Sequence, residues 1–157
     1  MSSRVEHTYD APVDAVYAKL TDEAHLRARA EDAGDFNIEV TVTERGDGVV
    51  TKLVRDIESE IPSFAKKFVD PVNHVTDEIV WRVEGDRRVG KLSVDVNARI
   101  SLSGTLTLSP AGERCRFTQE YTAKVNVPIV GGRIAKKVEQ ETHKAVTDSC
   151  AFTAKSL

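Results

Sequence analysis

Four polar side chains interrupt faces that are otherwise apolar, and their types suit ligand binding or acid–base chemistry. In chain order they are His7, Arg55, Gln119 and Thr142. Burying such a group without a hydrogen-bond partner costs roughly 1–3 kcal/mol, so each needs a partner in the protein or in a ligand. These four residues are therefore the first candidates for a functional site.

Gln119 and Arg55 have the most specific placement among them. Gln119 lies between Phe117 and Tyr121 in an alternating stretch, so its amide could orient a ligand; the alternative is a structural amide satisfied within the protein. Arg55 is in phase with the apolar residues two positions away on either side, and it could bind a ligand carboxylate. A one-residue error in register would instead place Arg55 in water. For His7 the alternative is a histidine hydrogen-bonded near a sheet edge.

Support for catalysis is thin. The sequence contains no phosphate-binding loop, serine-nucleophile elbow, zinc-protease motif or paired-cysteine site. His25, His74 and His143 lie in polar stretches, so we expect them on the solvated surface. Acid–base catalysis needs a side chain held beside the reacting atoms, and His7 and Tyr121 are the candidates. We assign no catalytic residue and predict no metal site and no cofactor.

Charge and hydropathy exclude several classes of partner. The 157 residues carry 22 basic and 25 acidic side chains, a net charge of −3, with no run of five like charges, so no nucleic-acid partner is expected. No secretory signal opens the sequence and no stretch approaches the roughly 20 apolar residues of a membrane span. We expect one cytoplasmic domain over residues 1–157, without stable membrane insertion. Cys115 and Cys150 are expected to be reduced thiols packed as apolar groups.

The first third of the chain predicts a strand followed by two short helices. Residues 3–9 alternate between apolar and polar, which is typical of a half-buried strand. Asp10 and Pro12 are helix-start residues, and apolar side chains follow them at helical spacing. A second start signal at 21–23 predicts a short helix over 24–30, and Gly34 ends this section.

The middle of the chain alternates with a period of two and is predicted to be strand. Turn residues such as Gly46-Asp47-Gly48 separate the alternating runs. One long bent strand and two short strands fit equally well around Asn97-Ala98-Arg99. The expected strands cover residues 36–43, 49–57, 79–83, 92–96, 100–108 and 115–125.

After Pro128 the apolar period changes to about four, which predicts a long amphipathic helix over residues 129–154. A helix is about 10 Å across, whereas six strands span nearly 30 Å at about 4.8 Å per strand. One helix therefore covers such a sheet only if the sheet curls around it, and a hollow remains where the two do not meet.

We expect this hollow to be a pocket of roughly 300–1,000 Å³, the usual size of ligand sites. The alternative is that the same side chains simply fill a core. The predicted wall consists of Tyr9, Phe36, Ile38, Leu53, Arg55, Ile79, Trp81, Leu92, Val94, Leu102, Phe117, Gln119 and Tyr121 from the sheet, and Ile134, Val138, Thr142 and Val146 from the helix.

The segment 61–68 interrupts the strand pattern. Phe64 and Phe68 are four residues apart, with Lys66 and Lys67 directed away from them, so a short amphipathic helix could close over the mouth of the hollow as a lid. The alternative is a loop anchored by its two phenylalanines.

Two motifs resemble a known superfamily. The opening Tyr9-Asp10-Ala11-Pro12-Val13-Asp14-Ala15-Val16-Tyr17, with Leu20-Thr21-Asp22 and Leu26 after it, resembles the start of the START-related, polyketide cyclase-like superfamily. Val127-Pro128-Ile129-Val130-Gly131-Gly132, leading into the long helix, is also similar, and the order of elements matches over the whole chain. More narrowly, the chain is similar to a branch common in actinobacteria.

The resemblance implies an α+β helix-grip fold, in which a curved antiparallel sheet of six or seven strands wraps a long C-terminal helix. The tryptophan pair often found shortly after Leu26 is replaced by Arg29-Ala30-Glu31, which speaks against an Hsp90-activator-like role.

A shared fold hosts many functions, so the function must be argued from the site. We expect binding of a lipophilic small molecule (a lipid, isoprenoid or polyketide-like compound) by a carrier or sensor. The alternatives are a cyclase- or aromatase-like enzyme and a protein-interaction module with a vestigial cavity. The sequence does not indicate an oligomeric state.

Overall fold

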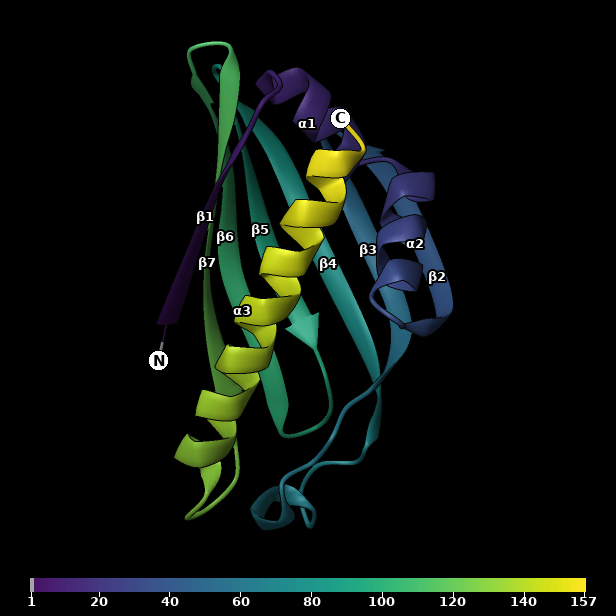
Figure 1. The fold of residues 1–157 in the computed structure, drawn as a ribbon, viewed down its shortest axis with the longest axis vertical. Helices are drawn as coiled ribbons and strands as arrows, with labels where there is room; N and C mark the ends of the chain where they lie inside the picture. The colour runs from purple at the N-terminus through teal and green to yellow at the C-terminus, as the bar shows by residue number, and fades with distance from the viewer. Residues whose placement is uncertain (1) are drawn as a thin grey trace.

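The computed structural model describes residues 2–157 and has the predicted α+β helix-grip fold (Figure 1). Seven antiparallel strands form one sheet in the order β1-β7-β6-β5-β4-β3-β2. The elements are β1 (Ser2–Tyr9), α1 (Val13–Leu20), α2 (Glu23–Asp32), β2 (Phe36–Arg45), β3 (Gly48–Glu58), the 3₁₀ turn η1 (Ser63–Ala65), β4 (Val72–Glu84), β5 (Arg87–Asp95), β6 (Ile100–Ala111), β7 (Arg114–Val125) and α3 (Gly131–Lys155).

The chain connectivity explains the curvature of the sheet. Helices α1 and α2 carry the chain from β1 at one edge to β2 at the other, and five successive antiparallel connections then return it to β1. The turns at Gly46, Gly85 and Gly112 have positive φ angles, which glycine adopts without steric cost. Because β7 must reach β1 beneath α3, the strands curl around one face, as Figure 1 shows.

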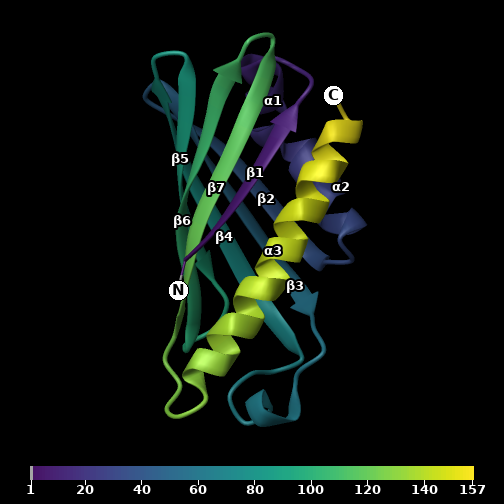
Figure 2. The same cartoon turned by 60° about the vertical axis from the view of Figure 1, so that its left-hand side comes forward.

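The three helices cover different parts of the concave face. Helix α3 packs against β7 and β1, α2 packs against β2, and α1 packs against β5, β6 and β7. Figure 2 shows α3 running beside β7 and β1, with the strands from β4 to β2 curving behind it. The middle of the concave face, on β3, β4 and β5, is therefore the part that the long helix covers least.

The structure decides between the alternatives that the sequence left open for two segments, residues 97–99 and residues 61–68. Residues 97–99 form a turn between two separate strands, closed by the Asn97 side-chain oxygen, which accepts from the backbone N–H groups of Arg99 at 2.8 Å and Ile100 at 3.0 Å. The segment 61–68 contains only the three-residue turn η1 and no amphipathic helix. Pro62 stands directly before the turn, in the position that Pro12 occupies before α1.

Phe36 does not take the wall position that alternation predicted for it. A β-bulge between Phe36 and Glu39 shifts the register, and Asn37 has a φ of 52°. Phe36 pairs with Asp56 on β3, and its side chain is 40% exposed. Ile38, within the bulge, packs against the cluster formed by Leu26, Ala30, Val40 and Leu53.

Both cysteines are free and buried in one apolar cluster. Burial raises the pKa of the Cys115 thiol to about 11, and it also raises the pKa of Cys150. Among residues 2–157, none of the helices has the length and apolar character that crossing a bilayer requires. The cytoplasmic location expected from the sequence stays a prediction.

Candidate functional site

The predicted wall residues divide into a buried group and a half-buried group. The buried group is dry core: Tyr9, Leu53, Trp81, Leu102, Phe117, Tyr121 and Ile134. The half-buried group comes from β2, β3, β4, β5, β7 and α3: Ile38, Arg55, Ile79, Leu92, Val94, Gln119, Val138, Thr142 and Val146. A well-packed core would bury the second group as fully as the first. The partial exposure therefore marks where the sheet and helices do not close on one another.

The apolar part of this half-buried group joins two core clusters. Ile79, Leu92 and Val146 pack against the cluster that contains Tyr9 and Trp81. Val94, Val138 and Val146 also border a second cluster, formed by Leu102, Tyr121 and Ala123. We call Ile79, Leu92, Val94, Val138 and Val146 the inner apolar strip. It runs along the concave face between β4 and β5 on one side and α3 on the other.

A small cavity of about 40 Å³ lies at one end of this strip, between the η1 segment and α3. Phe64, Ala65 and Val69 border it on one side, and Ile134 and Val138 on the other. This volume suits a few water molecules and is well below that of a drug-sized ligand. The segment predicted as a lid thus lies at the mouth of the concave face, in contact with the helix.

Arginine side chains cover the two phenylalanines of this segment. The Arg133 guanidinium lies 3.9 Å from the centroid of the Phe64 ring, and that of Arg99 lies 5.4 Å from Phe68. Both arrangements are cation–π contacts. Phe64 and Phe68 are consequently half-buried and do not form an exposed apolar patch.

Charged side chains also lie inside the fold on β3 and β4, where Arg55 pairs with Val75 and Asp77 pairs with Val94 of the strip. Arg55 faces inward as predicted and forms ion pairs with Asp77 at 2.8 Å and Asp35 at 3.3 Å. Burial alone favours the neutral form of Arg55, but the two carboxylates outweigh it and raise the pKa of the guanidinium. Burial raises the pKa of Asp35, and the guanidinium of Arg55 partly offsets this effect.

Arg29 of α2 joins this charged group from above the sheet. Burial lowers the pKa of its guanidinium, and the carboxylate of Asp77 is the strongest opposing influence. The Arg29 side chain is half-buried, and none of its nitrogens is among the fully buried side-chain atoms that lack a hydrogen-bond partner in the described chain. Sequence reasoning missed Arg29 because α2 looks polar, although its spacing from Leu26 and His25 places all three on one helix face.

Tyr9 and Gln119 bring further polar atoms to the same region. Tyr9 is 1% exposed, and its hydroxyl has no hydrogen-bond partner within the described chain. Burial is the main cause that raises the pKa of Tyr9, with Cys150 adding to it. Gln119 donates from Nε2 to the sulfur of Cys150 at 3.7 Å, which is a weak contact for an amide. Thr142 instead donates to the carbonyl of Val138 at 2.7 Å, so its hydroxyl is satisfied within α3.

His25 is not on the solvated surface, contrary to the sequence prediction. It is buried, and its Nε2 lies 3.0 Å from Oγ1 of Thr153 on α3. Burial and then the charge of Arg29 lower the pKa of His25. The prediction failed because α2 turns this ring toward the C-terminal end of α3. His74 and His143 are exposed, as expected.

The two residues considered for acid–base catalysis do not lie together. His7 pairs with Phe117 in the β-ladder and its ring centroid lies 4.5 Å from that of Tyr9, whereas Tyr121 pairs with Ser3. The Tyr121 hydroxyl is buried without a partner, and burial raises its pKa. Glu139 of α3, 6% exposed and absent from the sequence prediction, adds to that rise because its carboxylate lies near Tyr121.

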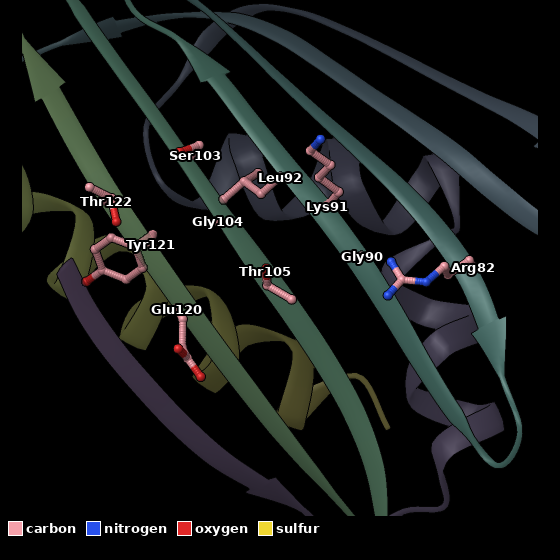
Figure 3. Close-up of a pocket in the computed structure, with 10 residues that line it drawn as sticks. All are labelled: Arg82, Gly90, Lys91, Leu92, Ser103, Gly104, Thr105, Glu120, Tyr121 and Thr122. Atoms are coloured by element: carbon pink, nitrogen blue, oxygen red, sulfur yellow. The ribbon is translucent and has the colours of Figure 1, made fainter.

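A larger depression of about 470 Å³ lies on the opposite, convex face of the sheet. Figure 3 shows it with the helices behind the sheet. A Cβ at Gly90 would lie 2.8 Å from the Ile79 side chain, and one at Gly104 would lie 2.2 Å from the Glu120 carbonyl, so these glycines let β5 and β6 bend inward. The depression is open and lined mainly by polar side chains, including Arg82, Lys91, Ser103, Thr105, Glu120 and Thr122.

Residues 4–157 match a family model described as "Protein of unknown function (DUF2505)". The chain belongs to this family. A search of curated proteins found no match. Neither comparison gives a function, so the function has to be argued from the fold and from the side chains of this chain.

Solved structures with the same fold cover almost the entire DUF2505 chain. A protein of Thermus thermophilus is similar with a TM-score of 0.69 and 20% identity, over 99% of this chain and 95% of that one. The STAR-related lipid transfer protein of Xanthomonas axonopodis has a TM-score of 0.63 and 14% identity, over 98% and 85%. Norcoclaurine synthase of Thalictrum flavum has a TM-score of 0.58 and 14% identity, over 99% and 92%. At these identities the likeness shows the helix-grip fold alone.

Proposed function

We propose that the chain binds a lipophilic small molecule between the concave face of the sheet and α3, as a carrier or sensor. The observation that carries this proposal is the inner apolar strip, whose side chains are half-buried between two filled core clusters. A fold evolved only for stability would close over these residues, because each buried CH₂ group contributes about 0.8 kcal/mol. A solved structure of the same fold is a STAR-related lipid transfer protein, which supports the assignment.

The affinity of such a site comes mainly from apolar burial. A ligand that buries about 300 Å² of apolar surface gains roughly 7 kcal/mol at 25 cal/mol per Å², before the costs of association are subtracted. The hydroxyl of Tyr9 and the indole N–H of Trp81 then set the orientation of the ligand, since both are buried without a hydrogen-bond partner in the described chain.

Ligand entry requires the mouth to open, because the cavity beside η1 is only about 40 Å³. The η1 segment is the part that moves in this proposal. It contains a single short turn and is held to α3 by side-chain contacts such as that of Phe64 with Arg133. These contacts can break without disrupting the β-ladder, and loops of this kind open on time scales of nanoseconds to microseconds.

The first experiment is native mass spectrometry of the purified protein, followed by extraction and identification of any bound small molecule. We expect a stoichiometric lipophilic passenger, and uptake of the neutral fluorescent probe N-phenyl-1-naphthylamine after it is removed. Val138→Trp should abolish both by filling the space between the strip and η1, whereas Ala145→Trp, at an exposed position of the same helix, should retain them. Probe uptake unchanged by Val138→Trp would contradict the proposed location.

An enzyme acting on a polyketide-like or lipid substrate is the second candidate. The observation in its favour is that two buried tyrosine hydroxyls, of Tyr9 and Tyr121, face the interior without partners. Loss of turnover in Tyr121→Phe with retained probe binding would favour this candidate. The interaction-module alternative expected an exposed apolar patch near Phe64 and Phe68, and both rings are instead half-buried beneath arginines.

A further inference from the structure

We propose that the end of the molecule around the η1 segment docks reversibly on an anionic lipid bilayer, with the Ile129 side chain among the headgroups and the surrounding lysine and arginine side chains on the lipid phosphates. This inference goes beyond the proposed function, because it names the surface at which an apolar ligand is loaded or released. It is testable on the ligand-free protein.

Three connecting segments form this end, which we call the basic end: residues 59–71, 95–99 and 124–137. The guanidinium groups of Arg99 and Arg133, from the second and third segments, lie over phenylalanine rings of the first. The backbone N–H of Asn126 donates to the carbonyl of Arg99 at 2.8 Å. The η1 segment and the loop between β7 and α3 are both at the lower end of the molecule in Figure 1 and Figure 2, so the three segments form one surface.

The basic end has the opposite charge to the chain as a whole. Its three segments contain seven basic and three acidic residues, whereas the net charge of the chain is −3. All seven basic side chains are exposed, and within residues 2–157 Lys137 alone among them has an ion pair, with Glu141. Lysine and arginine side chains this close together are attracted to anionic lipid headgroups, each adding to the binding. The seven are Lys66, Lys67, Arg99, Lys124, Arg133, Lys136 and Lys137.

Ile129, in the loop between β7 and α3, combines full exposure with a strained backbone. Its φ is 69°, and the N–H of Val130 donates across it to the carbonyl of Pro128 at 2.8 Å. Such a tight turn with a positive φ is disfavoured for a β-branched residue, whereas glycine adopts it without steric cost. Isoleucine here adds no packing to the fold, and a lipid surface supplies the apolar surroundings that its side chain lacks.

The same features favour a lipid surface over a nucleic acid as the partner of the basic end. Single-stranded nucleic acids stack their bases on exposed aromatic side chains. The aromatic residues of this end, Phe64 and Phe68, are half-buried beneath arginines, and the exposed apolar side chain is aliphatic. The cavity between η1 and α3 lies at this end as well, so docking brings the mouth of the inner apolar strip to the bilayer.

The test is co-sedimentation of the ligand-free protein with vesicles, either of phosphatidylglycerol and phosphatidylcholine in equal parts or of phosphatidylcholine alone. The wild type should partition at least about tenfold more strongly onto the anionic vesicles, and added salt should reduce this preference. Lys66→Gln/Lys67→Gln should weaken binding to the anionic vesicles by about tenfold. The control Lys52→Gln/Lys91→Gln makes the same change in net charge at exposed positions of β3 and β5, and it should weaken binding by less than about twofold.

Ile129→Gly separates docking from folding, because the two readouts respond differently. The midpoint of thermal unfolding should stay the same or rise, since relief of the strained φ offsets the added chain entropy of glycine. Binding to the anionic vesicles should fall by about fivefold, because the inserted side chain is lost. Unchanged vesicle binding in Ile129→Gly overturns the inference.

The remaining outcomes distinguish this inference from the proposed function. Equal partition of the wild type onto both kinds of vesicle, or a preference that survives Lys66→Gln/Lys67→Gln, overturns the inference. Retention of an RNA oligonucleotide without vesicle binding does so as well. None of these results affects the uptake of N-phenyl-1-naphthylamine, on which the proposed function depends. Vesicle binding by a protein that takes up no probe contradicts the proposed function and supports the docking surface.

Discussion

The two halves of α3 face different surroundings, although both have the same four-residue apolar period. The N-terminal half, around Ile134 and Val138, packs against the η1 segment and the start of β6. The C-terminal half, around Cys150 and Thr153, packs against Tyr9 and the buried ring of His25. Both halves bury polar side chains, Glu139 in the first and Thr153 in the second, but only the first is covered by the η1 segment. The following changes test this difference from the largest expected effect to the smallest.

Trp81→Ala should have the largest effect, since the C-terminal half of α3 rests on the core around this side chain. Trp81 is 2% exposed and meets the Tyr17 ring edge-on at 5.6 Å between centroids. We expect the free energy of unfolding to fall by about 3–5 kcal/mol, because the cavity left cannot fully close. Since Trp81 is the single tryptophan, urea unfolding should be followed by circular dichroism.

Ile134→Ala is the matched substitution in the N-terminal half, where the side chain is 3% exposed. It should lower the free energy of unfolding by about 2–4 kcal/mol. A larger loss for Ile134→Ala than for Trp81→Ala would show that the mouth, and not the end near α2, holds the fold together.

Asp77→Asn should have the next largest effect, because it removes one of two carboxylates held by Arg55 inside the fold. Breaking a buried ion pair costs about 3–5 kcal/mol, and the 23% exposure of the Asp77 side chain reduces the expected loss to about 2 kcal/mol. Urea unfolding at constant salt measures this loss.

The control for Asp77 is Asp148→Asn, which breaks the exposed pair with Lys144 at 2.7 Å on α3. Exposed pairs of this spacing contribute about 0.3–0.5 kcal/mol. Similar losses for the two variants would mean that the charges around Arg55 are effectively solvated.

Phe64→Ala tests the closed mouth. Removing a half-buried ring beneath Arg133 should lower the free energy of unfolding by about 1–2 kcal/mol and accelerate uptake of N-phenyl-1-naphthylamine in stopped-flow fluorescence. Phe36→Ala removes a phenylalanine that is 40% exposed and does not line the cavity beside η1, and it should leave the uptake rate unchanged. Equal uptake rates for Phe64→Ala and the wild type would place the entrance elsewhere.

The sequence predicted the elements of the fold well, because each has a clear period or a clear turn. Its failures have local physical causes. The bulge at Phe36 depends on the left-handed backbone of Asn37, which alternation does not encode. The η1 segment carried two phenylalanines at helical spacing, yet one such pair does not offset the cost of nucleating a helix in so short a segment.

The candidate site was harder to predict than the fold. Arg55 and the apolar wall follow from strand alternation, which assigns a face directly. Arg29 and His25 come from a short helix with little amphipathic character, so their inward orientation depends on how α2 docks onto β2 and α3. Glu139 belongs to the polar side of the α3 pattern and is buried only because β1 and β7 curl over that side. Tertiary packing, and not local sequence, places these charges in the interior.

His25 gives the smallest and most specific effect, on the link between α2 and the C-terminal half of α3. Burial lowers its pKa below the ordinary 6.5, so the unfolded chain binds a proton on this residue more readily than the folded chain does. The stability that this ring contributes is therefore present above about pH 6.5 and is lost as the pH falls toward the folded-state pKa. We expect the wild type to lose about 1 kcal/mol or less of unfolding free energy from this group between pH 7.5 and pH 5, measured by urea titration. His25→Gln should reduce the pH dependence, and His143→Gln, at an exposed position of α3, should leave it unchanged. An unaltered pH profile in His25→Gln would mean that the His25 ring is hydrated in the folded state. Water would then reach the contact between α2 and the C-terminal half of α3.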